Sequence, residues 1–206
     1  MNYLSLYMKF IPKSEETRQR IIEATAVIFN KQGFAGTSLS DLTRATNLTK
    51  GGIYGNFKNK EEVALAAFDY NLGMALETIS ARVSSKKTFT EKLIANIDVY
   101  YEQNKEMNES GGCPIQNAIV DSDDTHEELR VRAAQGLMCW NVIVMEIITN
   151  GIKAKEFHAG INIEKTALSI LAIIEGAILI GRATKEPAKQ NMVLDTAKEI
   201  VYGLRV

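Results

Sequence analysis

The residues best suited to binding chemistry lie in a short segment that begins at Thr49. Thr49 can cap a helix, and Lys50, Gly51 and Gly52 follow it, with Tyr54 one turn further on. Each glycine inside a short helix costs about 1 kcal/mol relative to alanine, so two in a row indicate that the backbone must approach another surface closely. A phosphate backbone and the base edges of the DNA major groove fit this requirement, and the side chains of Lys50 and Tyr54 can reach either.

The segment before Thr49 predicts how this helix is held. Residues 39–46 place apolar side chains on one face of a short helix, and Asn47 then tolerates the left-handed backbone of a tight turn. Leu48 and Ile53 anchor the next helix against the first, so the sequence predicts two short helices joined by a turn, the second of which can protrude. A helical hairpin without a ligand is the alternative, and the basic and polar residues up to position 60 favour binding.

A second group of polar residues could hold a metal ion or act in catalysis. It comprises Asp121, Asp123, Asp124, His126, Glu127 and Glu128. The chain contains one other histidine, His158, and no His-x-x-x-His, Cys-x-x-Cys or Gly-x-Ser-x-Gly motif. We interpret the acidic group as the solvated start of a helix and expect no enzyme activity, no cofactor and no metal site.

Cys113 follows two glycines and precedes Pro114, which suits the first turn of a helix. A helix N-terminus lowers the pKa of a thiol and makes it more reactive, so one hypothesis is that Cys113 senses electrophiles or oxidants. The simpler interpretation, a small buried apolar residue, is favoured. Two cysteines in the whole chain are too few for a disulfide scaffold and favour a reducing, cytoplasmic setting.

The elements that must position these residues are predicted to be helices. The 206-residue chain has three prolines, and no window alternates apolar and polar residues over the length of a strand. Helical spacing and capping residues predict helices near residues 15–32, 39–46, 49–57, 61–83, 91–103, 114–120, 125–150, 163–184 and 187–204. The predicted fold class is all-α, with a three-helix helix-turn-helix head and a six-helix body.

Charge is distributed unevenly between these two parts. Residues 1–60 carry nine Lys or Arg and four Asp or Glu, whereas residues 61–206 carry fifteen and twenty-one. A basic segment on an acidic body suggests that the first part alone touches a polyanion, so we expect domains at 1–60 and 61–206. The first twelve residues are expected to form a flexible arm, with Met8 as a second conceivable start. The apolar run 170–180 is too short to span a membrane.

The stretch from Thr17 to Ala67 resembles the DNA-binding head of the TetR family. The resemblance rests on Gln32-Gly33-Phe34, Thr37-Ser38, the run from Thr49 to Phe57 and Lys60-Glu61-Glu62. It implies contacts with double-stranded DNA by Thr37, Arg44, Thr49, Lys50, Gly51, Gly52, Tyr54, Asn56 and Lys60. Two positions depart from the family's pattern, because Asn47 stands where the turn often has glycine and Asn56 where histidine often precedes the phenylalanine.

The resemblance also implies a ligand cavity among the middle helices of the body. The run from Gly111 to Ala118 is similar to one subgroup of TetR-type regulators. Candidate wall residues are Tyr100, Tyr101, Met107, Cys113, Ile115, Met138, Trp140, Ile143, Val144 and Ile147. Few charges lie in these stretches, so we expect a small apolar or aromatic effector. A filled helical core is the alternative for each of these residues.

The last two predicted helices carry facing apolar stripes, which indicates an oligomerisation surface. Candidate interface residues are Leu171, Ile174, Gly176, Ile178, Met192, Val193 and Ile200. By resemblance, two such helix pairs form the four-helix bundle of a homodimer, which places two heads on a palindromic operator. An intramolecular hairpin is the alternative.

The resemblance implies a repressor that releases its operator when a small molecule binds the body. In the expected mechanism the ligand shifts the middle helices, the connector near 59–83 swings, and the spacing between the two heads changes. Three alternatives remain open: a trigger through modification of the Cys113 thiol, an activator, and a constitutive DNA-binding protein that takes no effector.

Overall fold

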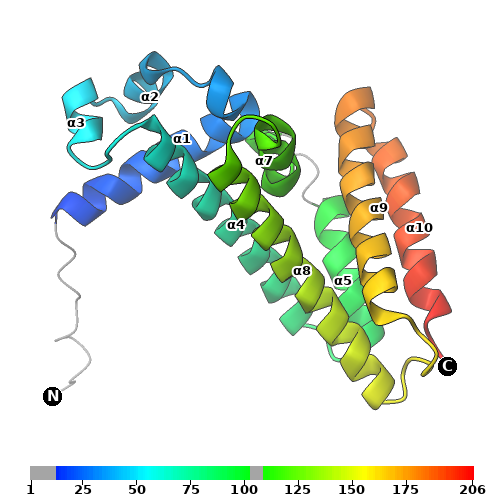
Figure 1. The fold of residues 1–206 in the computed structure, drawn as a ribbon. Coiled ribbons are helices and arrows are strands. Elements are labelled where there is room, and N and C mark those ends of the chain that lie inside the picture. The colour runs from blue at the N-terminus through cyan, green and yellow to red at the C-terminus, as the bar shows by residue number, and fades with distance from the viewer. Residues whose placement is uncertain (1–12, 103–108) are drawn as a thin grey trace, which may run out of the picture.

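The computed structural model describes residues 13–102 and 109–206, and helices make up most of both ranges (Figure 1). The helices are α1 (Lys13–Gly36), α2 (Leu39–Thr46), α3 (Lys50–Tyr54), α4 (Lys60–Ser84), α5 (Phe89–Glu102), α7 (Pro114–Ser122), α8 (Glu127–Lys153), α9 (Ile163–Thr184) and α10 (Pro187–Gly203). Within these ranges no β-strand is formed, and one isolated antiparallel bridge joins Phe157 to Arg205. The all-α prediction is confirmed. The arm expected at residues 1–12 lies outside the described residues.

The head consists of α1, α2, α3 and the first part of α4, which share one hydrophobic core. Ile21 of α1, Leu42 of α2 and Ile53 of α3 are buried in a single cluster. Val63 and Ala67 of α4 belong to the same cluster. The boundary expected after residue 60 therefore runs through the core of the head, which extends into α4.

Local sequence signals account for the turns of the head. Gly33 interrupts α1 with a φ of +71°, as expected of a glycine that ends a helix. Ser38 and Asp41 form a capping box at the start of α2. Asn47 ends α2 in the left-handed conformation, with a φ of 55°, which confirms the predicted turn.

The core of the body gathers around α8. Trp140 is buried, and its indole N–H donates to Asn96 Oδ1 of α5 at 2.9 Å. Ile174 of α9 and Val201 of α10 are buried in the same cluster. α9 and α10 lie side by side, on the opposite side of the molecule from α2 and α3 (Figure 1). The head and the last helix pair thus occupy separate ends of the fold.

α8 is long and apolar enough in composition to cross a membrane, and it is the one such helix within the described ranges. Its apolar side chains include Trp140, Val144 and Ile148, which are buried in the core of the body. The core helix of a water-exposed domain meets the same criteria of length and composition. The packing assigns α8 to the core.

Candidate DNA-binding surface and ligand cavity

α3 presents a bare backbone at the surface of the head. Thr49 caps it, because its Oγ1 accepts a hydrogen bond from Gly52 N at 3.2 Å, and Ile53 is its one buried residue. A Cβ on the exposed Gly51 would meet Thr49 Oγ1 at 3.9 Å and nothing nearer. The packing of the head therefore does not require glycine at this position, which supports an external contact.

Two exposed basic side chains lie on α2 and α3. Lys50 Nζ lies 6.0 Å from the centroid of the Tyr54 ring, so an ammonium and a phenol lie close together on α3. Arg44, near the end of α2, keeps 77% of its side chain exposed although its guanidinium pairs with Asp41. These groups can meet a polyanion without any change in the core of the head.

Other predicted DNA-contact residues have partners inside the protein. Thr37 is 1% exposed and its hydroxyl donates to Gly33 O at 2.7 Å, so the prediction of a side-chain contact with DNA is wrong for Thr37. Lys60 Nζ donates to Phe34 O in the last turn of α1 at 2.7 Å and to Thr37 O, just after that helix, at 2.9 Å. Asn56 Nδ2 donates to Gly52 O at 2.9 Å. DNA contacts by Lys60 and Asn56 stay predictions.

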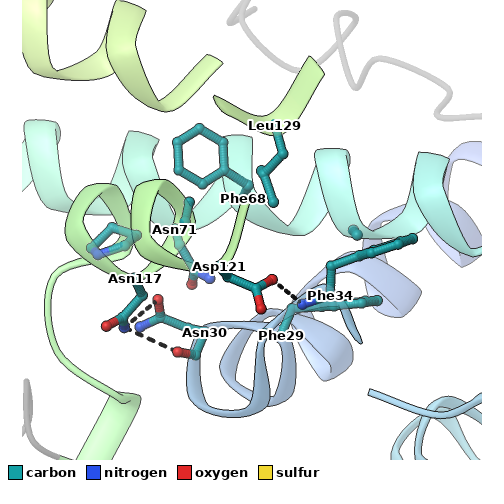
Figure 2. Close-up of a pocket in the computed structure, with 12 residues that line it drawn as sticks. Phe29, Asn30, Phe34, Phe68, Asn71, Asn117, Asp121 and Leu129 are labelled. Atoms are coloured by element: carbon teal, nitrogen blue, oxygen red, sulfur yellow. Dashed lines mark hydrogen bonds between the residues drawn. The ribbon is translucent and has the colours of Figure 1, made fainter. Parts of the chain in front are cut away.

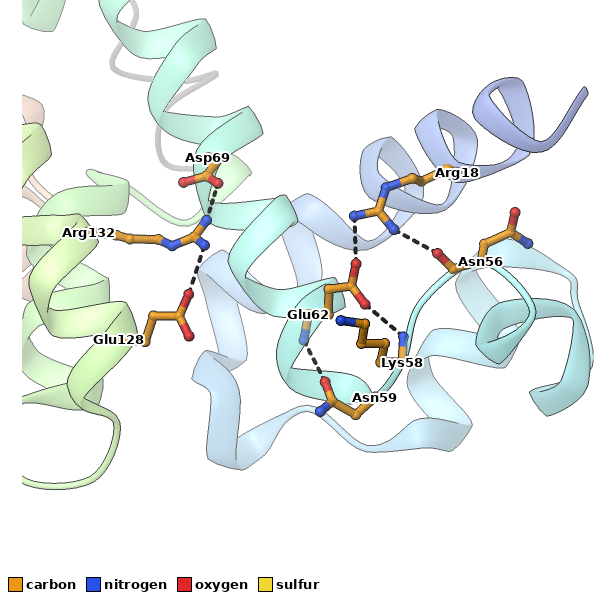
Figure 3. A network of polar contacts seen from close by, with 8 residues as sticks. All are labelled: Arg18, Asn56, Lys58, Asn59, Glu62, Asp69, Glu128 and Arg132. Atoms are coloured by element: carbon orange, nitrogen blue, oxygen red, sulfur yellow. Dashed lines mark hydrogen bonds and ion pairs between the residues drawn. The ribbon is translucent and has the colours of Figure 1, made fainter. Parts of the chain in front are cut away.

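A polar network holds the loop that leads from α3 into α4 (Figure 3). Arg18 of α1 donates to the main-chain oxygen of Asn56 at 2.6 Å and to Glu62 Oε1 at 3.0 Å, and its guanidinium lies 3.9 Å from the centroid of the Phe57 ring. Glu62 accepts a hydrogen bond from Lys58 N at 2.7 Å, which lowers the pKa of the Glu62 carboxyl. No local pattern in the sequence indicates this role of Arg18, because its partners lie 38 and 44 residues away in the chain.

A cavity of about 300 Å³ opens in the body between α4, α5, α7 and α8. Its lining comprises Asn30, Asn71, Leu72, Met74, Ala75, Leu76, Thr78, Ile79, Tyr100, Ser110, Gly112, Cys113, Pro114, Ile115 and Trp140. Four of the predicted wall residues, Tyr100, Cys113, Ile115 and Trp140, are among them. The centroids of the Tyr100 and Trp140 rings are 5.7 Å apart. A mostly apolar cavity with aromatic rings and a few polar groups suits a small organic molecule.

Five of the other predicted wall residues do not line this cavity. Ile143, Val144 and Ile147 pack in the filled core of the body. Met138 is 47% exposed on the outside of α8, and the Tyr101 hydroxyl is hydrogen-bonded to Asp195 on α10. Met107 lies outside the described residues. Helical periodicity identifies the apolar positions of these helices but not which neighbour each position faces.

α4 supplies the part of the wall that sequence analysis missed. Its residues from Asn71 to Ile79 run along the cavity. Leu72, Leu76 and Ile79 recur at intervals of four and three residues, which is the spacing of one helix face. That spacing was the available signal for the cavity wall. It did not stand out, because α4 also carries the apolar residues that pack in the head.

Cys113 packs against a buried carboxyl group. Its Sγ donates to Glu175 Oε1 at 2.9 Å, and Glu175 Oε2 is buried with no hydrogen-bond partner in the part of the chain that the structure describes. Burial raises the pKa of the Cys113 thiol well above its ordinary value, and the Glu175 carboxyl raises it further. A raised pKa opposes the activation on which the sensing hypothesis depends, so the geometry agrees with the interpretation of Cys113 as a small buried residue.

A smaller pocket lies at the junction of head and body (Figure 2). Phe34 and Phe29 of α1 form part of its apolar lining. Asp121 Oδ2 of α7 accepts a hydrogen bond from Phe34 N at 2.6 Å, and Asn117 Nδ2 of α7 donates to Asn30 O at 3.0 Å. Hydrogen bonds to main-chain atoms near the end of α1 thus fix the head to the body.

The acidic group around His126 serves the start of α8 and its contacts with α4. His126 caps α8, and its Nε2 lies 3.3 Å from Glu61 Oε1. Arg132 pairs with Glu128 at 2.8 Å and also with Asp69 of α4 (Figure 3). Over residues 13–102 and 109–206, no three side chains of His, Cys, Asp or Glu gather as a metal site would require.

The predicted dimer stripe of α9 is turned inward. Leu171, Ile174 and Ile178 are at most 2% exposed and pack in the core of their own protomer, so the prediction that they form the interface is wrong. The exposed small and apolar residues of the pair include Leu168, Ala172, Leu179, Ile180, Met192 and Tyr202, and Val193 and Ile200 are half-buried. Gly176 lies in line with them, and a Cβ there would meet nothing within 4 Å. α9 is apolar on more than one side, so its sequence pattern does not reveal which side faces out.

Comparisons with known proteins agree with this architecture. Residues 21–67 match the family described as bacterial regulatory proteins, tetR family, and residues 90–197 match the tetracyclin repressor-like C-terminal domain. A solved TetR-family transcriptional regulator from Cytophaga hutchinsonii is 46% identical, with a TM-score of 0.92, over 96% of this chain and 99% of that one. A second, from Chloroflexus aurantiacus J-10-FL, is 33% identical, with a TM-score of 0.88, over 93% and 97%.

A curated relative also matches nearly the whole chain. The probable HTH-type transcriptional regulator ArpR of Pseudomonas putida is 27% identical over 201 residues, which cover 93% of this chain and 91% of that protein. Fold, surface and matches together define a helix-turn-helix transcriptional regulator. The chain belongs to the TetR family.

Proposed function

We propose that this protein is a transcriptional repressor that releases its DNA operator when a small molecule occupies the cavity of the body. The observation that carries the proposal is the double role of α4. Val63 and Ala67 pack in the core of the head, and the segment that lines the cavity, from Asn71 to Ile79, begins about one turn after Ala67 on the same helix. A ligand that displaces the cavity-lining segment of α4 therefore also moves the part of α4 against which the core of the head packs, and with it α3.

We assign the contact with duplex DNA to Lys50, Gly51, Gly52 and Tyr54 of α3, with Arg44 beside them. The exposed backbone of α3 favours close approach to the major groove, and the two basic side chains favour phosphate or base edges. A homodimer would present two such helices to a palindromic operator. The exposed apolar face of α9 and α10 supports that assembly.

The effector that we propose is a small apolar or aromatic compound. Tyr100 and Trp140 offer ring faces, and Leu72, Leu76 and Ile79 add aliphatic surface. Burial of such a compound releases apolar area from water, and a few polar groups of the lining can fix its orientation.

The test begins with selection of a tight-binding duplex from random-sequence DNA by the purified protein. Fluorescence anisotropy then compares the selected duplex with wild type, with the double variant Lys50→Ala/Tyr54→Phe and with Lys165→Ala, an exposed lysine of α9. We expect the double variant to lose about 1–3 kcal/mol of binding free energy and a weaker salt dependence, with Lys165→Ala unchanged. Equal affinity and salt dependence for the double variant and wild type would contradict the proposed DNA surface.

The second arm titrates the protein–duplex complex with a panel of aromatic compounds. We expect at least one compound to release the duplex and to quench the fluorescence of Trp140, the single tryptophan of the chain. Release without a change in that fluorescence would contradict the assignment of the cavity as the effector site.

A further inference from the structure

Asn30 lies where the head, the cavity and the junction pocket meet. It belongs to α1 of the head and yet lines both the cavity and the junction pocket. Its Nδ2 donates to Ser110 O at 2.8 Å and to Gly112 O at 3.0 Å. Ser110 and Gly112 are themselves part of the cavity wall, so a side chain of the head is hydrogen-bonded to the main chain of the effector cavity.

Asn117 of α7 holds Asn30 from the other side (Figure 2). Its Nδ2 lies 3.0 Å from Asn30 O, 3.1 Å from Asn30 Oδ1 and 2.7 Å from Gly111 O. Its Oδ1 accepts a hydrogen bond from Arg182 Nη1 of α9 at 2.9 Å. A continuous line of hydrogen bonds therefore joins α1, the cavity wall, α7 and α9.

The wall segment packs closely against α1 and α9. Gly111 and Gly112 adopt φ angles of +103° and +88°, which favour glycine. A Cβ on Gly111 would lie 2.9 Å from Lys31 Cγ of α1, and a Cβ on Gly112 would lie 2.7 Å from Arg182 Nη1 of α9. A ligand that pushes this wall outward is therefore expected to press on α1 and to strain the hydrogen bonds of Asn30.

We propose that Asn30 is the positioning residue through which occupancy of the cavity is transmitted to the DNA-binding head. This inference rests on the proposed function and adds a route to it. Occupancy of the cavity is coupled to the head through the Asn30–Asn117 pair and α1. This route acts in addition to the displacement of α4 that any ligand in the cavity can cause. Ligand and operator affinities are then coupled by the free energy that these hydrogen bonds contribute in the DNA-bound state.

The test needs a cavity occupant that does not depend on the identity of the effector. Ala75 of α4 lines the cavity, and Cys139 is the exposed cysteine of the chain. In the variant Cys139→Ser/Ala75→Cys, benzyl methanethiosulfonate transfers its benzylthio group to the new thiolate and releases methanesulfinate. Mass spectrometry confirms a single modification. Cys139→Ser/Glu77→Cys, modified at an exposed position of the same helix, controls for the label itself.

Affinity for the selected duplex is measured before and after labelling. We expect labelling at position 75 to weaken binding by about tenfold or more, and labelling at position 77 to leave it unchanged. With Asn30→Leu added, the loss of affinity on labelling should be smaller than in the parent by about threefold or more, and the displacement of α4 accounts for what remains. Gln32→Leu, which removes an exposed carboxamide of the same helix, should keep the full response. A full response in the Asn30→Leu protein overturns the inference.

Two further measurements keep the inference testable if Asn30→Leu folds poorly. Asn117→Ala removes the hydrogen bonds of the Asn117 side chain to Asn30, Gly111 and Arg182 and should also reduce the effect of labelling on duplex affinity. Hydrogen exchange in the unsubstituted Asn30 background should show faster exchange of the amides of residues 31–36 after labelling, and unchanged exchange there overturns the inference. Absence of any labelling effect in the parent would instead refute the proposed ligand response, and with it the coupling.

Discussion

Among single residues, the glycines of α3 allow the stability of the protein and its affinity for DNA to be tested separately. In a helix interior, alanine is favoured over glycine by up to about 1 kcal/mol. Because a Cβ at Gly51 meets no crowded atom, we expect Gly51→Ala to leave the free energy of unfolding unchanged or to raise it by up to about 1 kcal/mol. The same methyl group projects from the surface that we assign to DNA, so affinity for the selected duplex should fall by about tenfold.

Urea unfolding and fluorescence anisotropy on the same preparation check both halves of this prediction. Gly73→Ala on α4 is the matched control, because a Cβ there meets nothing within 4 Å and lies outside the DNA surface. A Gly51→Ala protein that binds the duplex as tightly as wild type would mean that α3 does not approach DNA through its backbone.

Glu175 predicts a pH dependence of stability. Burial raises the pKa of its carboxyl above the ordinary value of 4.5, although the hydrogen bond from Cys113 lowers it in part. The raised pKa belongs to the folded protein, so the contribution of Glu175 to stability is complete at low pH and is lost as pH rises through that folded pKa. Relative to Glu175→Gln, the wild type should therefore lose stability as pH rises above the ordinary carboxyl pKa of 4.5.

Chemical unfolding at several pH values measures this difference, with the exposed Glu199→Gln as the control. Glutamine keeps an acceptor for the Cys113 thiol and carries no charge, so the variant isolates ionisation from packing. Parallel pH profiles for the wild type and Glu175→Gln would show that the carboxyl is solvated in the folded protein.

At the scale of elements, the ends of the helices were predictable because local residues set them. Thr49 at the start of α3, Pro114 at the start of α7 and Asn47 at the end of α2 act within their own turn. The faces of the helices were predictable only in part. α9 has apolar residues on several sides, and whether Ile174 or Leu179 faces solvent is decided by α10, which no pattern within α9 encodes.

The contact between α1 and α7 gives a prediction for an element pair. Asp121 accepts a hydrogen bond from Phe34 N, and a hydrogen bond to a charged group contributes about 1.5–3 kcal/mol. Partial exposure reduces this value, so we expect Asp121→Ala to lower the free energy of unfolding by about 1 kcal/mol. It should also raise hydrogen exchange at the end of α1.

Asp124→Ala, at an exposed position three residues further along the chain, is the control for Asp121→Ala in the same experiment. If both variants lose stability equally, the head is held to the body by apolar packing rather than by this hydrogen bond.

At the scale of the whole molecule, the exposed face of α9 predicts a dimer. Leu179 is 57% exposed, so Leu179→Glu should leave the protomer folded with an unchanged thermal transition. In a two-fold bundle the glutamate would face its own copy in an apolar contact, so light scattering should show a monomer. Duplex affinity should fall by at least about a hundredfold, because one protomer cannot hold two half-sites.

Val120→Glu controls for the added charge, since Val120 is 73% exposed on α7 and lies outside the proposed interface. A Leu179→Glu protein that remains dimeric would move the interface to another surface, such as the exposed part of α8 around Val142. Ile174→Glu should unfold the protomer instead, because Ile174 is fully buried.

The cavity is the feature of the whole molecule that the sequence predicted least well. Its wall is assembled from segments as far apart as Asn30 and Trp140. Aromatic residues of the middle helices indicated part of it, but the contribution of α4 depends on how that helix leaves the head. Asn30 carried no local signal, since its acceptors lie 80 and 82 residues away.

The sharing of α4 between two cores limits how such a protein can be recombined. A chimera that joins a foreign DNA reader to this body at residue 60 would separate Val63 and Ala67 from the side chains with which they pack. A crossover placed after Tyr70, the last α4 residue that packs against that cluster, would keep the core of the reader intact. Exchange of specificity between relatives is therefore expected to succeed when the splice falls inside the long helix and to fail at the loop that precedes it.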